Sequence, residues 1–151
     1  MNKKMLKISA INEGTVIDHI STINTFKVAE FLNLKEGEDV VTVGMNFESK
    51  KLGKKGVIKI GGRFLTKNEV NKIALIAPEA NINIIKDYGV KEKFKVEIPD
   101  VIKGIIKCAN TNCITNKESA KTKFHVLCKD PLKLRCHYCE RVVGKEDIGL
   151  L

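Results

Sequence analysis

Cys-Ala-Asn-Thr-Asn-Cys at residues 108–113 and Cys-His-Tyr-Cys at residues 136–139 form two closely spaced cysteine pairs in the last third of the chain. Two short cysteine hairpins at this separation can fold back so that four thiolates converge on one tetrahedral cation, as zinc requires. We therefore predict a zinc site with the ligands Cys108, Cys113, Cys136 and Cys139. Four thiolates leave no open position for water or substrate, so we expect the metal to stabilise a fold.

Two disulfides are the competing interpretation of these cysteines. The chain starts Met-Asn-Lys-Lys-Met-Leu-Lys, without the apolar stretch and cleavage site of a secretory signal, so we expect a cytoplasmic protein. A reducing compartment favours metal over disulfides. The fifth cysteine, Cys128, lacks a partner at ligand spacing. We expect it to be a buried free thiol in a strand, with a reactive thiol as the alternative.

Composition indicates a globular protein without membrane spans. The chain has 151 residues, of which 43% are hydrophobic, and no apolar run approaches the roughly 18 residues of a membrane span. A net charge of +9 would ordinarily suggest a nucleic-acid partner. However, no run of Lys and Arg exceeds two residues. The strongest cluster, within residues 50–59, suits a compact polyanion better than a long nucleic acid.

The first part of the chain alternates strand and helix patterns. Strands are predicted at residues 6–11, 15–20, 40–46, 56–60, 81–85 and 90–96, with a short helix at 23–32. A second helix starts at the capping box Thr66-Lys67-Asn68-Glu69 and stops at Pro78. The order strand–helix–strand–strand–helix–strand, with one added strand, is the ferredoxin-like plan. We therefore expect two helices on one face of a mostly antiparallel sheet.

Ile98-Pro99-Asp100 is predicted to be a hinge, because proline cannot continue a strand ladder. This gives a domain at residues 1–97 and a second at 101–151, where strands are expected at 101–107, 123–129 and 132–135. About 50 residues with few apolar side chains make a marginal core, which a metal would stabilise. The predicted fold class is α+β: an N-terminal ferredoxin-like βαββαβ-type domain and a small, all-β zinc-binding domain.

Catalytic patterns are lacking, whereas an anion site has some support. The sequence contains no Gly-x-Ser-x-Gly, Walker or Gly-x-Gly-x-x-Gly motif. Asp18 and His19 are adjacent in a predicted strand, so their side chains should face opposite ways and form no dyad. Lys55 and Lys59 lie near Gly53 and Gly56 and can bind phosphate, although a solvated loop is the alternative. Asp18, Asn83 and Tyr88 can supply donors and acceptors to a base and a ribose.

Longer stretches resemble a known family. These are Gly14-Thr15-Val16-Ile17-Asp18-His19-Ile20, Gly44-Met45-Asn46, Lys54-Lys55, Ile58-Lys59-Ile60, Ala77-Pro78 and Asn83. The tail adds Cys-x-Asn-x-Asn-Cys-Ile from Cys108 and Cys-x-Tyr-Cys-Glu from Cys136. Together they resemble the regulatory chain of aspartate carbamoyltransferase over nearly the whole length of the sequence.

The resemblance implies a noncatalytic subunit that binds CTP, UTP or ATP at one allosteric site. Such chains form homodimers that bridge catalytic chains in an enzyme of pyrimidine biosynthesis. The implied nucleotide-binding residues are Ile8, Ile11, Asp18, His19, Lys55, Lys59, Asn83, Ile85, Tyr88, Val90 and Lys93. Ile11 and Tyr88 would lie near the base, Asp18 and Lys59 near the ribose, and His19 and Lys93 near the phosphates. The implied contacts with the catalytic chain are Asn110, Asn112, Glu140 and Arg141.

Regulation by such a site requires that the nucleotide prefer one quaternary state, with the zinc domain as the coupler. Two alternatives remain open. A four-thiolate ribbon can bind nucleic acid, for which the tail offers Phe124, His125 and Tyr138 as stacking side chains. The other alternative is a small enzyme that acts on nucleotides.

Overall fold

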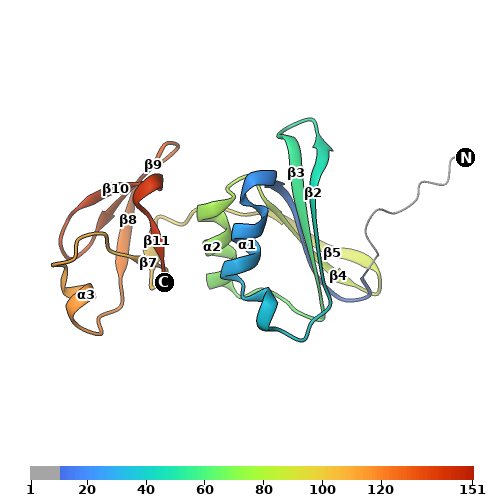
Figure 1. Ribbon diagram of the computed structural model, residues 1–151, viewed down its shortest axis with the longest axis horizontal. Coiled ribbons are helices and arrows are strands. Elements are labelled where there is room, and N and C mark those ends of the chain that lie inside the picture. Colours follow the sequence, from blue (N-terminus) through green and yellow to red (C-terminus); the bar gives the residue numbers. More distant parts are fainter. Residues whose placement is uncertain (1–10) are drawn as a thin grey trace, which may run out of the picture. The chain divides into compact units, whose positions relative to one another are not determined.

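The computed structural model describes residues 11–151, and the chain divides into two compact units (Figure 1). The first unit ends at Glu97 and the second comprises Ile98–Leu151. The strand predicted at residues 6–11 lies outside the described residues except for Ile11. No helix among the described residues is long and apolar enough to cross a membrane.

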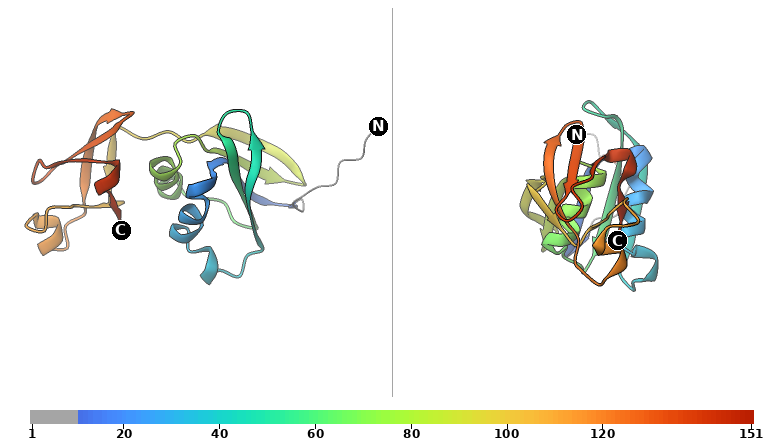
Figure 2. Two further views of the ribbon diagram at one scale, coloured as in Figure 1. Left: turned by 45° about the horizontal axis from the view of Figure 1, so that its top comes forward. Right: turned by 90° about the vertical axis from the view of Figure 1, so that its left-hand side faces the viewer.

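The first unit is an antiparallel sheet with the strand order β2-β3-β1-β4-β5. Its strands are β1 (Gly14–Ser21), β2 (Val41–Ser49), β3 (Gly53–Gly61), β4 (Asn81–Lys86) and β5 (Gly89–Lys95). Helices α1 (Thr25–Phe31) and α2 (Lys67–Ile76) cover one face of this sheet, as Figures 1 and 2 show. Strands β1 to β4 with both helices have the ferredoxin-like order, and β5 is added beyond β4. The predicted fold class is thus confirmed.

The two faces of this sheet differ because side chains alternate along each strand. Ile17 on β1 is paired with Ile58 on β3 and with Ile82 on β4, and all three are fully buried beneath the helices. The preceding residue, Val16, is paired with Lys59 and Asn83. The face away from the helices therefore carries polar side chains.

The first helix is shorter than predicted. One-turn 3-10 helices, η1 (Thr22–Asn24) and η2 (Leu34–Glu36), lie on either side of α1. Asn33 adopts a left-handed conformation with φ of 55°, which ends the α-helical path after Leu32.

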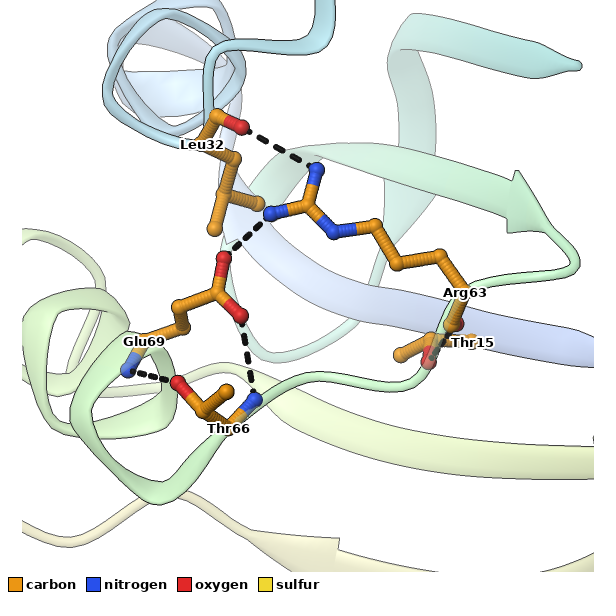
Figure 3. A network of polar contacts seen from close by, with 5 residues as sticks. All are labelled: Thr15, Leu32, Arg63, Thr66 and Glu69. Carbon is orange, nitrogen blue, oxygen red and sulfur yellow. Dashed lines mark hydrogen bonds and ion pairs between the residues drawn. The ribbon is translucent and has the colours of Figure 1, made fainter. Parts of the chain in front are cut away.

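Helix α2 begins at the predicted capping box. The Thr66 hydroxyl accepts a hydrogen bond from Glu69 N at 3.2 Å, and the Glu69 carboxylate accepts one from Thr66 N at 3.0 Å. The same carboxylate forms an ion pair with Arg63, whose guanidinium also donates to Leu32 O at 3.1 Å (Figure 3). Thr15 Oγ1 in turn donates to Arg63 O at 2.7 Å. This network joins the start of α2 to the end of α1 and to β1.

The second unit contains short strands and two helical turns. These are β6 (Val101–Lys103), β7 (Ile106–Lys107), α3 (Ile114–Lys117), β8 (Lys123–Lys129), β9 (Leu132–Cys136), β10 (Val142–Gly144), the 3-10 helix η3 (Lys145–Asp147) and β11 (Gly149–Leu150). The order β10-β9-β8-β6 forms one sheet, and β7 pairs with β11. The strand predicted at 101–107 is interrupted at Gly104, where φ is 68°. Phe124, Ile102 and Leu134 form the centre of a small core.

Candidate metal centre and open sheet face

The four predicted ligand cysteines lie together in the second unit. The sulfur atoms of Cys108, Cys113, Cys136 and Cys139 all lie within 4.8 Å of one another. Cys108 Sγ is 3.6 Å from Cys139 Sγ, and Cys113 Sγ is 3.7 Å from Cys136 Sγ. Four sulfurs each about 2.3 Å from a tetrahedral zinc ion would be about 3.8 Å apart. The observed spacing thus fits a tetrahedral metal site.

Two tight turns position these sulfurs. Cys108 follows β7 and Cys113 precedes α3, while Cys136 ends β9. Cys113 N donates to Asn110 O at 3.0 Å, and Glu140 N donates to Cys136 O at 2.9 Å. Glu140 closes the second turn in a left-handed conformation with φ of 64°.

Burial and hydrogen bonds set the acidity of the thiols. Burial raises the pKa of Cys108 to about 12 and also raises the pKa of Cys136. Burial acts in the same direction on Cys139, but hydrogen bonds from the Arg141 backbone and the Asn110 side chain lower its pKa to about 7. Without a metal, the Cys108 and Cys136 thiols are therefore protonated at neutral pH. A cation must displace these protons to bind.

Two polar residues on α3, which the sequence did not predict, hold the first cysteine turn. The Asn116 side-chain amide donates to Cys108 O at 2.9 Å and to Asn110 O at 2.7 Å. Thr115 Oγ1 donates to Cys113 Sγ at 3.2 Å. Both residues follow the cysteine pair on α3, beyond the cysteine pattern, so ligand spacing alone gave no signal for them. They hold the turn and one sulfur in place.

The proposed contacts with a catalytic chain lie around these turns. Asn112, Glu140 and Arg141 are exposed, whereas Asn110 is half-buried. Asn110 also accepts a hydrogen bond from Asn112 N at 3.0 Å through its side-chain oxygen. Asn110 therefore supports the shape of the turn, and the other three side chains are accessible.

Several residues of the predicted nucleotide site lie on the sheet face away from the helices, here called the open face of the first unit. Lys59 on β3 and Asn83 on β4 both pair with Val16 on β1, and Asn83 also pairs with Lys93 on β5. Directly paired residues project from the same side of a sheet. Lys59, Asn83 and Lys93 thus form a polar row across three strands, away from the helices. Asn83 Oδ1 is buried and has no hydrogen-bond partner among residues 11–151.

Asp18 and His19 contact each other, so the prediction that they face opposite ways was wrong. The β1–β3 register shifts between Ile17 and Ile20, and His19 has φ of 58°. This β-bulge breaks the alternation of side chains on which the prediction rested. His19 Nδ1 lies 3.6 Å from Asp18 Oδ2, and Lys55 Nζ lies 2.9 Å from Asp18 Oδ1. The bulge therefore gathers Asp18, His19 and Lys55 into one cluster.

Two further contacts fix this cluster. Asp18 Oδ1 accepts a hydrogen bond from His19 N at 2.6 Å. His19 Nδ1 is 3.1 Å from the side-chain nitrogen of Asn81. Asn81 was not among the predicted residues, because its contact with His19 depends on the bulge.

The remaining predicted residues lie mostly around the β4–β5 turn. Ile85 is buried and pairs with Gly14 and Val90, which continues the open face beyond the polar row. Tyr88 and Val90 are exposed, and Tyr88 N donates to Asn12 O at 2.9 Å, next to half-buried Ile11. Ile8 lies outside the described residues. The structure thus separates a charged part of the face from an apolar end.

Cys128 lies in β8, but it is exposed, so the expectation of a buried thiol was wrong. The register of β8 against β9 shifts between Val126 and Cys128, which disrupts the alternation there. Phe124, in the same strand, is 1% exposed and cannot stack on a nucleic-acid base. The nucleic-acid alternative thus loses one of its three stacking side chains.

Two family models match the chain and meet near the boundary between the units. Residues 6–97 match the allosteric domain of the aspartate carbamoyltransferase regulatory chain, and residues 100–149 match its metal-binding domain. The regulatory chain from Pyrococcus abyssi is 58% identical over 145 residues, which cover 95% of both chains. That from Phocaeicola vulgatus is 49% identical over 150 residues, covering 99% of this chain and 97% of the relative. The chain therefore belongs to the family of aspartate carbamoyltransferase regulatory chains, which are noncatalytic subunits.

Proposed function

We propose that this regulatory chain binds CTP, UTP or ATP on the open sheet face and transmits feedback control of pyrimidine biosynthesis to separate catalytic chains. The observation that carries the proposal is the polar row of Lys59, Asn83 and Lys93 beside the cluster of Asp18, His19 and Lys55. Cations, a carboxylate and an amide on one face match the phosphates, ribose and base of a nucleotide.

The two parts of this face suit the two ends of a nucleotide. His19 and Lys93 supply positive charge to the phosphates, and Asp18 accepts hydrogen bonds from ribose hydroxyls. The apolar end near Ile85 and Tyr88 suits a planar base. Asn83 Oδ1, buried without a partner among the described residues, can accept from the exocyclic amino group that cytosine and adenine share.

The ion pair between Lys55 and Asp18 orders the site before a ligand arrives. Both side chains are mostly buried, with 20% and 24% of their area exposed, and Nζ lies 2.9 Å from Oδ1. A carboxylate held in this way loses little further freedom on binding. Lys55 thus orients Asp18 and adds positive charge near the phosphates.

We propose zinc as the metal of the second unit, one ion per chain, held by Cys108, Cys113, Cys136 and Cys139. The sulfur spacing and the four-thiolate donor set both suit zinc. A reducing compartment such as the cytoplasm would keep these thiols available. With the metal bound, Asn112, Glu140 and Arg141 are held at exposed positions, where they can contact a catalytic chain.

We also propose that the chain forms a homodimer through the β2 edge of the first unit. The opposite edge strand, β5, carries Lys91, Glu92, Lys93 and Lys95, and such charges discourage edge pairing. Beside β2 lies a pocket of about 450 Å³, whose apolar lining residues include Phe26, Val41 and Val43 and whose rim carries Glu30, Lys35 and Glu36. We propose that a second copy of the chain pairs its β2 with this β2 and covers the pocket, because two identical edges can pair symmetrically.

Calorimetry tests the nucleotide site. We expect the zinc-loaded chain to bind CTP at one class of site, with ATP competing and no nucleotide hydrolysed. Lys59→Ala should weaken both nucleotides by about 1–3 kcal/mol, because it removes a charged contact, and zinc content should not change. Lys67→Ala removes a lysine from the first turn of α2, on the other side of the sheet, and is the matched control.

Equal affinity in Lys59→Ala and the parent would remove Lys59 from the site. Failure of the parent to bind either nucleotide would contradict a preformed site on the free chain. A salt-sensitive complex with short RNA, unaffected by CTP, would instead favour the nucleic-acid alternative.

A further inference from the structure

Two histidines contact each other on the outer face of the second unit. His125 Nε2, from β8, lies 2.9 Å from His137 Nδ1, just after β9, and the ring centroids are 5.2 Å apart. His137 N donates to Lys123 O at 2.8 Å, so the ladder between the strands continues to this residue. The Tyr138 ring packs edge-on against His137, with centroids 5.1 Å apart. Both imidazoles are therefore held by paired backbone.

This pair is distinct from the four-sulfur centre. Phe124 and Cys136 are cross-strand partners and point into the core, with 1% and 0% of their area exposed. The residues that follow them, His125 and His137, are half-buried and exposed, respectively. Successive side chains of a strand face opposite sides. The imidazoles thus lie on the solvent side of the sheet.

We propose that His125 and His137 chelate one late divalent transition-metal ion, such as Ni²⁺ or Cu²⁺, at a second metal site. The two nitrogens are 2.9 Å apart. With metal–nitrogen bonds of about 2.0–2.1 Å, the nitrogen–metal–nitrogen angle would be about 90°. That is the cis angle of square-planar or octahedral coordination and is smaller than the tetrahedral angle that zinc prefers. On binding, the proton between the two nitrogens moves to the other nitrogen of its own ring, so that both contacting nitrogens offer a lone pair to the ion, and water completes the shell.

The charges around the pair select for this class of ion. Burial lowers the pKa of His125, and so do the nearby His137, Arg135 and Lys123. Lowering this pKa favours the neutral imidazole, which is the form that binds metal. The same positive charges oppose Mg²⁺ and Ca²⁺, which bind oxygen ligands mainly through charge. Ni²⁺ and Cu²⁺ gain strong bonds to imidazole nitrogen instead.

Calorimetric titration of the zinc-loaded full chain with Ni²⁺ alone tests the proposal. The titration uses a Cys128→Ser background, because an exposed thiol would itself bind the ion. We expect one Ni²⁺ per chain with no release of zinc. His125→Gln and His137→Gln should each weaken binding by about 10- to 100-fold, because one remaining imidazole cannot chelate. His19→Gln changes the remaining histidine of the chain, which lies in the first unit, and should leave the Ni²⁺ affinity unchanged.

Paramagnetic broadening of histidine ring signals by Ni²⁺ gives a second readout, which should affect His125 and His137 but not His19. Unchanged affinity in His125→Gln would overturn the proposal. Two equal weak Ni²⁺ sites, one of which is lost in each variant, would also overturn the proposal, because the two imidazoles would then bind Ni²⁺ independently. Equimolar zinc release would place the added ion in the four-sulfur centre and would equally overturn it.

Discussion

A single residue, His19, determines the shape of the proposed nucleotide site. Its positive φ accompanies a bulge in β1 that brings the His19 imidazole near the Asp18 carboxylate. The same carboxylate forms an ion pair with Lys55. Ile17 and Ile20 are both buried although they lie three residues apart, a spacing that strict alternation would place on opposite faces of the sheet. The resemblance named Asp18, His19 and Lys55, which the structure brings together, whereas alternation alone predicted the wrong geometry for Asp18 and His19.

Gly56 is a residue at which even a small substitution should be costly. A Cβ atom there would lie 1.9 Å from Thr25 Oγ1 and 2.7 Å from Thr25 Cγ2, in the buried contact between β3 and α1. We expect Gly56→Ala to lower the free energy of unfolding by about 1–3 kcal/mol, because the core is overpacked. Denaturant unfolding of the zinc-loaded chain measures this difference.

Gly61→Ala, in the same strand, is the matched control. Its Cβ would lie 3.5 Å from Val40 O, an ordinary contact, so the free energy of unfolding should change little. Equal effects of the two substitutions would mean that the contact between Gly56 and Thr25 is looser than the structure shows.

At the scale of elements, local signals predicted α2 far better than α1. The capping box at Thr66 marks the start of α2 through hydrogen bonds between neighbours in sequence. The α1 region depends instead on Asn33, whose left-handed conformation ends the helix, and no spacing pattern reveals that conformation. In the second unit, β10 and β11 have three and two residues, too few for a periodic pattern. β11 pairs with β7, which is distant in sequence, whereas β10 pairs with the preceding strand β9 across the second cysteine turn.

Thr66→Ala should lower the free energy of unfolding by about 0.5–2 kcal/mol, because the Glu69 backbone N–H loses its acceptor. The substitution should also weaken contacts beyond α2, because Glu69 forms the ion pair with Arg63 that connects the network of Figure 3. Denaturant unfolding monitored by circular dichroism checks the value. Asn68→Ala, at an exposed position in the same turn, is the control. A Thr66→Ala chain as stable as that control would show that the cap contributes nothing.

At the scale of the whole molecule, the metal centre should make zinc affinity depend steeply on pH. The pKa values of Cys108, at about 12, and of Cys136 are both raised, so both thiols carry protons at neutral pH until zinc displaces them. Each displaced proton changes the affinity by about tenfold per pH unit. We expect affinity to fall by at least about 100-fold per unit as pH decreases from 8 to 7. Competition with a chelator of known pH dependence measures this slope.

Removal of zinc should separate the two roles of the chain. We expect the metal-free chain to lose its association with catalytic chains and to retain CTP binding, because the two sets of residues lie in different units. Sedimentation with catalytic chains and calorimetry with CTP check the two expectations. A metal-free chain that still holds the catalytic chain would refute the coupling role of zinc. For the pH dependence of zinc affinity, a slope near tenfold per pH unit would mean that zinc displaces only one proton.

The proposed homodimer has its own test. Phe26 is 60% exposed and lines the pocket next to β2, and Phe26→Lys should shift the zinc-loaded chain from dimer to monomer in sedimentation. Leu127→Lys places the same charge on β8 in the second unit, where 50% of the Leu127 side chain is exposed, and should leave the dimer intact. A Phe26→Lys chain that still sediments as a dimer would place the interface elsewhere.

The unequal edges of the five-stranded sheet also limit how far assembly can proceed. If both edges could pair, each added copy would present a fresh edge, and the chains would grow into an open ribbon. In the proposed homodimer, the charged β5 edge would stay unpaired and β2 would join the two copies. Once two copies have joined there, both outer borders of the combined sheet are β5. Growth of the proposed assembly would therefore terminate at two copies, and a regulatory subunit made in excess of its partners would avoid polymerising.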